Sequence, residues 1–263
     1  ILEQVTEEET APAEPMIRVR SLTQVFGEEP EKAIELYRAG RSKQEIFEET
    51  GSTVALIDIS FDVMRGETFV LMGLSGSGKS TLLRCINRII EPTSGEAWID
   101  GKDIVPMGEE ELREVRRRKL GMIFQNFALL PHRTVLENVA FGLEIQGVPA
   151  EERHAKAEEV LQMVGLGGYG ASMPGELSGG MKQRVGLARA LTSDPDVLLM
   201  DEAFSVQGLL VAYIGLPLAI GMYLVYKFVK KTRVVPLDTM DLPLIHIPEP
   251  TRLRSISYAV FCL

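Results

Sequence analysis

The chain of 263 residues has few of the residues on which secreted, metal-binding and nucleic-acid-binding proteins depend. Its two cysteines, Cys85 and Cys262, cannot form a disulfide framework and lack metal-site spacing. Basic residues are not in excess: the net charge is −9 and the isoelectric point about 5.1, so there is no global electrostatic case for binding nucleic acid. His132 and His154 have no partners at metal-ligand spacing. This composition favours a reducing compartment such as the cytosol, with Cys85 as a small buried residue.

Residues 1–15 do not have the pattern of a signal peptide. Residues 1–15 are acidic and contain proline, with neither a basic stretch nor an apolar run, so we expect a disordered segment and not a signal peptide. The first residue is not Met, and we expect a fragment at this end. Apolar residues make up 45% of the chain, which is enough for a sizeable core, and the length predicts one or two domains.

The most specific signal in the chain is the stretch from Gly73 to Ser80, which fits G-x-x-x-x-G-K-[ST] at every fixed position. Its glycines let backbone amides approach phosphate oxygens, Lys79 supplies a charge to the β- and γ-phosphates, and Ser80 can ligate Mg²⁺. A β-prone run at 68–72 precedes the loop, and a helix-like run at 81–88 follows it. This order places a helix N-terminus at the phosphates, so we predict a nucleotide site and not a chance match in a surface loop.

The chain up to residue 200 alternates between strand and helix patterns. The strands are predicted at 17–20, 54–63, 97–101, 120–124 and 197–200, and the helices at 30–50, 109–119, 134–139, 151–164 and 185–191. Gly40 is expected to divide the first helical stretch, and Thr134 and Glu137 are spaced as a capping box. The arginines of 109–119 share their helix with four glutamates, which favours a solvated face over a nucleic-acid site.

Two further stretches carry weaker signals when taken alone. The turn Ser178-Gly179-Gly180 opens a helical stretch, so its backbone amides and the helix dipole can bind an anion, although a simple capped helix has the same pattern. The apolar strand at 197–200 delivers Asp201 and Glu202 to its carboxyl end. Asp201 there can hold Mg²⁺, and Glu202 can polarise a water.

Taken in this order, the phosphate loop, Gln125, residues 177–184 and Asp201-Glu202 resemble the ATPase subunits of ABC transporters. The stretches 28–52, 72–81, 87–93 and 199–205 are similar to the ATP-binding subunit of bacterial glycine betaine/proline importers. The resemblance covers residues 16–205. It implies an α/β P-loop fold of the ABC ATPase type, with a parallel core sheet, an antiparallel β subdomain and a helical signature subdomain.

The resemblance implies ATP and Mg²⁺ as ligands and assigns roles to matching residues. The residues implied to cradle the phosphates are Gly73, Ser75, Gly76, Gly78, Lys79, Ser80 and Thr81, and those near the metal are Ser80, Gln125 and Asp201. Glu202 would be the general base, and Gln125 would sense the γ-phosphate and couple to the membrane subunit. Ser178, Gly179 and Gly180 would bind the ATP of an opposite subunit. Phe26 is the candidate to stack on adenine, with a core phenylalanine as the alternative.

The resemblance also implies partners and a location. A head-to-tail dimer of two nucleotide-binding subunits would work with membrane permease subunits and, indirectly, with a solute-binding protein. The complex would couple ATP hydrolysis to import of glycine betaine, proline or similar quaternary ammonium osmolytes. The subunit would be peripheral, on the cytoplasmic face of the bacterial inner membrane. The importer is expected to have no nucleic-acid partner. A non-transport ABC ATPase, a soluble binding or repair module, is the alternative.

After Ser205 the resemblance ends, which makes the ABC domain at 16–205 incomplete. Residues 206–226 are uncharged and basic residues follow, which predicts a transmembrane helix within 206–233 that would make the chain integral, with a buried core helix as the alternative. Residues 206–243 resemble the last helix and tail of an amino-acid permease, and 244–263 resemble translated sequencing adapter. We therefore expect three joined pieces, with an artefactual tail at 234–263, in preference to a natural fusion. Such a truncated chain would hydrolyse little or no ATP.

Overall fold

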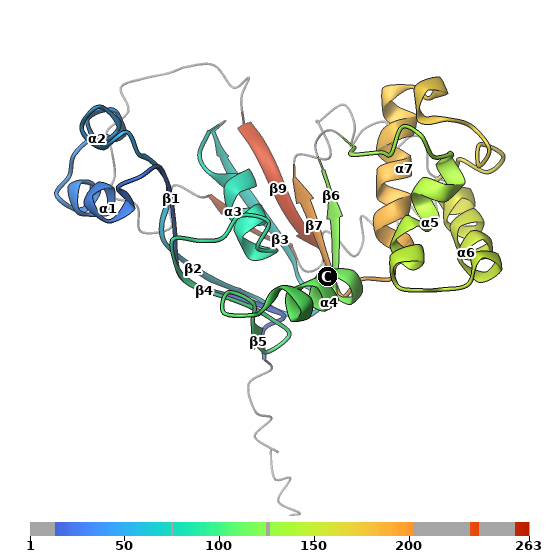
Figure 1. Cartoon of the computed structure of the whole chain (residues 1–263), viewed down its shortest axis with the longest axis horizontal. Helices are drawn as coiled ribbons and strands as arrows, with labels where there is room; N and C mark the ends of the chain where they lie inside the picture. The colour runs from blue at the N-terminus through green and yellow to red at the C-terminus, as the bar shows by residue number, and fades with distance from the viewer. Residues whose placement is uncertain (1–13, 75, 125–126, 202–231, 237–255, 263) are drawn as a thin grey trace, which may run out of the picture.

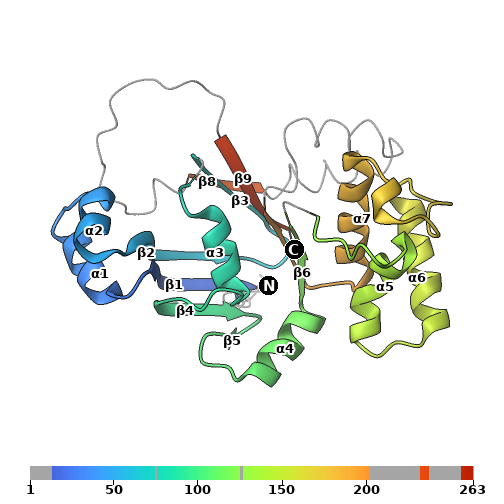
Figure 2. The same cartoon turned by 45° about the horizontal axis from the view of Figure 1, so that its top comes forward.

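The computed structural model describes residues 14–74, 76–124, 127–201, 232–236 and 256–262. Within these ranges two sheets lie side by side, with a group of three helices beyond the second sheet (Figure 1). The first sheet has the order β2-β1-β4-β5, and the second has the order β6-β7-β9-β3-β8. A view turned by 45° shows the same sequence of parts, with α1 and α2 at one end and α5 to α7 at the other (Figure 2).

The first sheet is antiparallel throughout. Its strands are β1 (Ile17–Phe26), β2 (Thr53–Val63), β4 (Ser94–Ile99) and β5 (Lys102–Asp103). The strand predicted at 17–20 therefore runs on to Phe26. Register shifts in its pairing with β2, the first between Val19 and Leu22, interrupt the alternation of buried and exposed residues that predicts a strand. This irregularity explains why the sequence pattern revealed only the first four residues.

A pair of short helices connects β1 to β2, as predicted. Helix α1 (Pro30–Arg38) and helix α2 (Lys43–Thr50) are separated at Gly40, which has a φ of +83° that favours glycine. The pair packs on the sheet through a small apolar cluster of its own, made by Val25, Ala33, Tyr37, Ile46, Val54 and Ile57. Burial of Tyr37 in this cluster raises the pKa of its hydroxyl.

The second sheet contains β3 (Thr68–Leu74), β6 (Leu120–Ile123), β7 (Val197–Asp201), β8 (Thr232–Pro236) and β9 (Ile256–Cys262). The pairs β6–β7 and β3–β8 are parallel, whereas β9 lies antiparallel between β3 and β7. Within the domain predicted at 16–205, β6 and β7 are parallel as expected, and the antiparallel strand β9 lies outside that range. The sequence of β9, rich in β-branched and aromatic residues, suits a strand that pairs on both edges.

The two sheets share one hydrophobic core. The rings of Phe61 on β2 and Phe69 on β3 stack at 4.9 Å between centroids and 8° between planes. Helix α3 (Lys79–Ile86) packs into the same core through Leu82, Leu83 and Ile86, which are fully buried. Cys85 on this helix is also fully buried, and burial raises the pKa of its thiol to about 12. The prediction of a small buried cysteine is confirmed.

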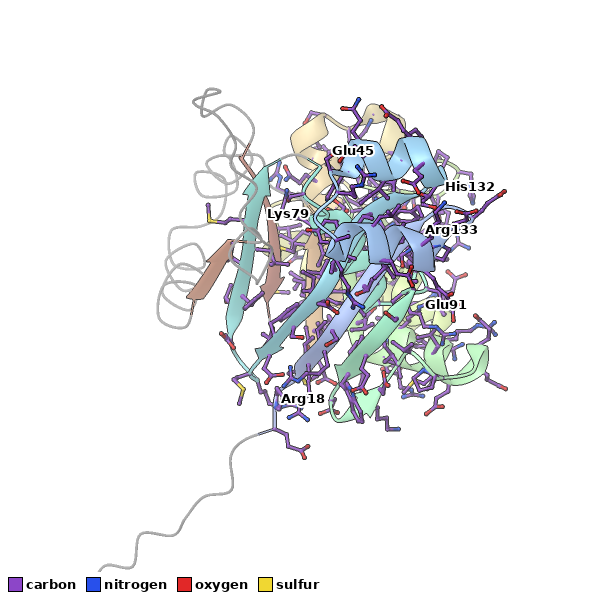
Figure 3. All side chains as sticks on the ribbon, turned by 90° about the vertical axis from the view of Figure 1, so that its left-hand side faces the viewer. Arg18, Glu45, Lys79, Glu91, His132 and Arg133 are labelled. Carbon is purple, nitrogen blue, oxygen red and sulfur yellow. The ribbon has the colours of Figure 1, made fainter. Side chains whose placement is uncertain are left out.

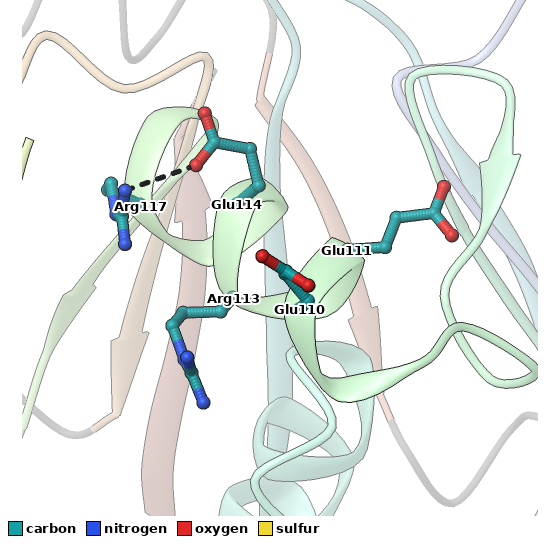
Figure 4. Close-up of a pocket in the computed structure, with 5 residues that line it drawn as sticks. All are labelled: Glu110, Glu111, Arg113, Glu114 and Arg117. Atoms are coloured by element: carbon teal, nitrogen blue, oxygen red, sulfur yellow. Dashed lines mark ion pairs between the residues drawn. The ribbon is translucent and has the colours of Figure 1, made fainter.

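Helix α4 (Glu109–Arg118) corrects one interpretation of the sequence. A pocket on this helix is lined by charged side chains, namely Glu110, Glu111, Arg113, Glu114 and Arg117 (Figure 4). Arg116 instead donates to the carbonyls of Asn87 at 2.9 Å and Arg88 at 2.6 Å, just beyond the end of α3. The interpretation as a solvated face is therefore wrong for Arg116, because carbonyls at a helix end need donors from outside the helix.

A layer of three helices lies beyond β6 (Figures 1 and 2). The helices are α5 (Val135–Ile145), α6 (Ala150–Met163) and α7 (Gly179–Thr192), with a single 3₁₀ turn, η1 (Pro174–Glu176), before α7. They pack around their own apolar cluster, which includes Val139, Leu161 and Val185. The predicted capping box at α5 is confirmed: the Thr134 hydroxyl accepts from the Glu137 amide, and the Glu137 carboxylate accepts from the Thr134 amide.

Several predictions concern residues outside the described ranges. These include the disordered segment within 1–15, except for residues 14 and 15, and the membrane helix at 206–226. Of the range 206–233, Thr232 and Arg233 are described, and both lie in strand β8. No helix among the described residues has the length and apolar character that a membrane span requires.

Candidate functional site

The phosphate loop connects the end of β3 to the start of α3, as the sequence predicts. Gly76 and Gly78 have φ angles of +82° and +96°, in the left-handed region that favours glycine. Gly78 is also the residue that caps α3, and a Cβ atom there would lie 2.8 Å from the carbonyl oxygen of Ala55 on β2. The loop is therefore pressed against the first sheet at a point where no side chain fits.

Lys79 is the first residue of α3 and is almost fully buried. Its ammonium group donates to the Gly73 carbonyl and to the Ser77 hydroxyl, both at 3.1 Å. His132, by contrast, is exposed and lies at the margin of the fold in Figure 3. The loop thus holds its own cation at the helix N-terminus. Ser77 is an addition to the residues predicted from the sequence, where it occupied a variable position of the motif.

Ser80 and Asp201 are 121 positions apart in the chain, and the structure brings them into contact. The Ser80 hydroxyl donates to Asp201 Oδ1 at 2.6 Å. Asp201 is the last residue of β7 and is only 1% exposed, while Ser80 lies in the first turn of α3. Thr81 follows on the same turn and is half-buried. Two of the three residues expected near the metal therefore meet at the carboxyl end of a buried strand.

Arg84 also contacts Asp201, with its guanidinium 3.6 Å from Asp201 Oδ2. It lies one turn after Ser80 on α3, on the same face of the helix. Arg84 is an addition to the site residues predicted from the sequence, although its spacing of four from Ser80 places the two side chains on one face of a helix. The side chain of Arg84 is 45% exposed, in contrast to its partner.

The signature stretch opens a helix as predicted. Ser178 precedes α7, and its hydroxyl accepts from the amide of Met181 at 3.4 Å. Gly179 and Gly180 are exposed, and a Cβ at either would meet no described atom within 4 Å. Helix α7 and the phosphate-loop helix α3 lie apart in both views (Figures 1 and 2). The structure therefore does not join the two predicted anion sites within one chain.

Three predicted site residues, Ser75, Gln125 and Glu202, lie outside the described residues. The structure describes the chain again from Phe127: Phe127 and Ala128 have φ angles of +58° and +46°, which are uncommon for residues with a side chain. Arg189 on α7 donates to both of their carbonyls, at 2.9 and 2.6 Å. Burial lowers the pKa of Arg189. The helix of the signature stretch thus holds the segment that follows Gln125.

The sequence profile of the family described as "ABC transporter" matches residues 56–205. The match contains the phosphate loop, the signature stretch and Asp201, in the order in which the fold uses them. The chain belongs to the ABC transporter family. The apolar segment that follows Ser205 lies outside this match.

Similar proteins in this ABC family include glycine betaine subunits. The chain is 57% identical over 189 residues to the glycine betaine transport ATP-binding protein OpuAA of Bacillus subtilis, covering 72% of this chain and 45% of the relative. It is 56% identical over 189 residues to the glycine betaine/proline betaine transport system ATP-binding protein ProV of Escherichia coli, covering 72% and 47%. The chain therefore spans about half the length of these relatives.

A solved structure supports the same assignment. The chain aligns with the ATP-binding cassette MJ0796, solved as a dimer in a post-hydrolysis state bound to ADP and Pi. The TM-score is 0.64 and the identity 32%, and the alignment covers 84% of this chain and 87% of the other. The ABC ATPase fold is thus shown both by sequence and by structure.

The residues present fit the ligands of an ABC ATPase. Positive φ angles at Gly76 and Gly78 and the N-terminus of α3 form a cradle of backbone amides for phosphate oxygens, next to the Lys79 ammonium. No group of three or more His, Cys, Asp or Glu side chains that could hold a metal occurs among the described residues. Mg²⁺ does not require one, because it commonly binds one or two protein ligands together with waters and substrate phosphates. Ser80 and Asp201 supply that kind of partial site.

Phe26 ends β1 and is 42% exposed, so the alternative of a core phenylalanine is wrong. It pairs with Thr53 on β2, two residues before Ala55, whose carbonyl lies against the phosphate loop at Gly78. An exposed aromatic ring therefore lies on the strand pair that borders the loop. This position suits a ring that contacts a base attached to the phosphates, which the structure leaves as a prediction.

Proposed function

We propose that the chain is the ATP-binding and ATP-hydrolysing subunit of an ABC importer for glycine betaine, proline betaine or a similar quaternary ammonium osmolyte. The observation that carries the ATPase part is the Ser80–Asp201 hydrogen bond at the N-terminus of the helix that begins with Lys79. The substrate part is supported by 55–57% identity to subunits named for glycine betaine and proline betaine transport.

Each residue near the loop has a role in this proposal. The amides around Gly76 and Gly78 bind the phosphate oxygens, and Lys79 exchanges its bonds within the loop for bonds to the β- and γ-phosphates. Ser80 and Asp201 would hold Mg²⁺, which would neutralise charge on the phosphates. Glu202 accepts a proton from the water that attacks the γ-phosphorus, and the bond to the leaving ADP oxygen breaks.

The signature stretch is proposed to complete the site of a second subunit. Gly179 and Gly180 are exposed on α7, apart from the phosphate loop of their own chain. Exposed backbone amides at the start of a helix can bind an anion, but the phosphate loop of the same chain lies too far away to supply one. In a head-to-tail dimer the ATP bound to the partner subunit would lie against these amides. The similar cassette MJ0796 is described as dimeric. The proposal therefore includes two composite sites in a dimer.

The ATPase part of the proposal can be tested apart from transport, with one variant for ATP binding and another for hydrolysis. Lys79→Ala should abolish ATP binding, measured with a fluorescent ATP analogue, because the buried ammonium is lost. Lys156→Ala is the matched control, since Lys156 is an exposed lysine on α6 that pairs with Glu159. In the intact subunit, Glu202→Gln should leave ATP binding unchanged, stop hydrolysis and shift the protein to a dimer in size-exclusion chromatography with ATP, whereas this chain by itself is expected to hydrolyse little or no ATP. Hydrolysis that survives Glu202→Gln would remove Glu202 from its role.

Association with membrane subunits tests the transport part. In the proposal the chain is a peripheral subunit on the cytoplasmic face of the inner membrane, bound to permease subunits and linked through them to a solute-binding protein. An affinity-tagged chain should co-purify with permease subunits from detergent extracts and support uptake of labelled glycine betaine under osmotic stress. ATP binding without either result would favour a non-transport ABC ATPase.

A further inference from the structure

Both carboxylate oxygens of Asp201 are occupied by groups from one helix. The Ser80 hydroxyl donates to Oδ1 at 2.6 Å, and the Arg84 guanidinium lies 3.6 Å from Oδ2. Both partners project from α3, one turn apart. The arrangement is therefore a clamp from the phosphate-loop helix onto the end of β7.

The charge of Asp201 needs such a partner. Asp201 is 1% exposed, and an ionised carboxylate in that position is costly unless it is paired and hydrogen-bonded. A serine hydroxyl supplies a hydrogen bond but no charge. Arg84 supplies the charge, and because its own side chain is 45% exposed it keeps contact with water while doing so.

We propose that Arg84 is a positioning residue that balances the charge of Asp201 when Mg²⁺ is absent and competes with Mg²⁺ when ATP binds. This inference rests on the proposed function, in which Asp201 helps to hold the metal. Two cations beside one carboxylate repel each other, so Arg84 must give up its place as the metal arrives. Arg84 therefore raises the Mg²⁺ concentration that the site requires. When the metal is absent, Arg84 stabilises the site by balancing the charge of Asp201.

The first test is a Mg²⁺ titration of the full chain, with binding of a fluorescent ATP analogue as the readout. Arg84→Gln removes the charge and should lower the half-saturating Mg²⁺ concentration roughly fivefold, the size expected for a partly solvated cation near the metal. Arg84→Lys keeps the charge and should stay within about twofold of the unmodified chain, since an ammonium still repels the metal. An unchanged or raised Mg²⁺ requirement in Arg84→Gln would overturn the inference.

The control removes a similar ion pair elsewhere. Arg38 on α1 pairs with Asp58 at 3.4 Å, and both side chains are exposed. Arg38→Gln should leave the Mg²⁺ requirement unchanged, because the pair lies outside the phosphate loop. If Arg38→Gln shifts the half-saturating Mg²⁺ concentration as much as Arg84→Gln does, the effect comes from the loss of any positive charge, which would contradict the specific role of Arg84.

The second test needs neither nucleotide nor metal. In EDTA, Arg84→Gln should lower the melting temperature by about 3 °C, because the buried carboxylate loses its counter-charge. In an Asp201→Asn background the same change should have no effect, since a neutral amide needs no cation. Equal losses in both backgrounds would overturn the charge balance, and Arg84→Met repeats the comparison if Arg84→Gln does not fold.

The two tests also separate this inference from the function on which it rests. An unmodified chain that binds no ATP with Mg²⁺ contradicts the proposed function, whatever Arg84 does. A chain that binds ATP with Mg²⁺ but responds equally to Arg84→Gln and Arg38→Gln contradicts only the role of Arg84.

Discussion

Replacing Gly78 by alanine tests the geometry of the phosphate loop most directly. The new Cβ would lie 2.8 Å from the Ala55 carbonyl oxygen and 2.9 Å from Leu56 Cδ2, and the φ angle of +96° is unfavourable for alanine. Gly76→Ala is a matched control, since its φ is +82° but its Cβ would meet no described atom within 4 Å. The two substitutions share the strain of the backbone and differ in the collision with β2.

The difference can be given a size. A left-handed backbone costs alanine about 1–2 kcal/mol, which lowers the free energy of unfolding of both variants. Forcing a methyl group against fixed neighbours costs about 1–3 kcal/mol more, and only Gly78→Ala bears this cost. The carbonyl that the methyl group meets belongs to a sheet, so it cannot move aside as the end of a side chain can. The backbone cost cancels between the two variants, so we expect Gly78→Ala to lie about 2 kcal/mol below Gly76→Ala in the free energy of unfolding, the middle of the range for the collision alone.

Urea unfolding followed by circular dichroism measures this difference, and the slopes for the two variants should agree. ATP binding should also fall more in Gly78→Ala, since the loop must move away from β2 to relieve the collision. Equal stability and equal ATP affinity in the two variants would refute the close packing of the loop against β2.

Three further outcomes follow from other parts of the structure. Thr134→Ala should destabilise the chain by about 1 kcal/mol, measured in urea, because the capping box of α5 is lost, and an unchanged midpoint would argue against that cap. Cys85 should react with a thiol reagent at pH 8 only after unfolding, tested in a Cys262→Ser background, because burial raises the pKa of its thiol to about 12. The hydrogen bond from Lys119 lowers the pKa of Asp100 below its ordinary 3.8, so its stabilisation is present above that value and is lost as the pH falls through the lower folded pKa. Asp100→Asn should therefore cost stability at pH 7 and progressively less below pH 4 in acid melts, and a constant difference at every pH would contradict the shift.

The sequence predicted the phosphate loop and the strand before it well, because both depend on residues that are adjacent in the chain. A β-prone run, a glycine loop and a helix occur in continuous sequence, and their geometry follows from backbone preferences. The meeting of Ser80 and Asp201 could be expected from a more general rule, since strands that run in the same direction end at the same edge of a sheet. Strands β3 and β7 do so here, although β9 lies between them. The roles given to Gln125 and Glu202 stay predictions.

The sequence could not predict contacts that depend on which face of a helix is buried. Arg116 lies in a stretch rich in charged residues, and only its packing against the end of α3 decides what its guanidinium reaches. The spacing of Arg84 places it on the same helix face as Ser80, but its contact with Asp201 also depends on how α3 packs. Likewise, β9 pairs on both edges with strands distant in the chain, and such long-range pairing has no local signal in the sequence. Phe26 could be placed only once the irregular register of β1 was known.

The central claim is that Ser80 and Asp201 form one site for Mg²⁺ and ATP. The most direct measurement is the affinity of the chain for ATP with and without Mg²⁺, compared with Asp201→Asn. Asp196→Asn is the control, since Asp196 is an aspartate just before β7 whose side chain is 44% exposed. The account predicts that Mg²⁺ strengthens ATP binding in the unmodified chain and in Asp196→Asn but not in Asp201→Asn. An equal response to Mg²⁺ in all three would contradict it.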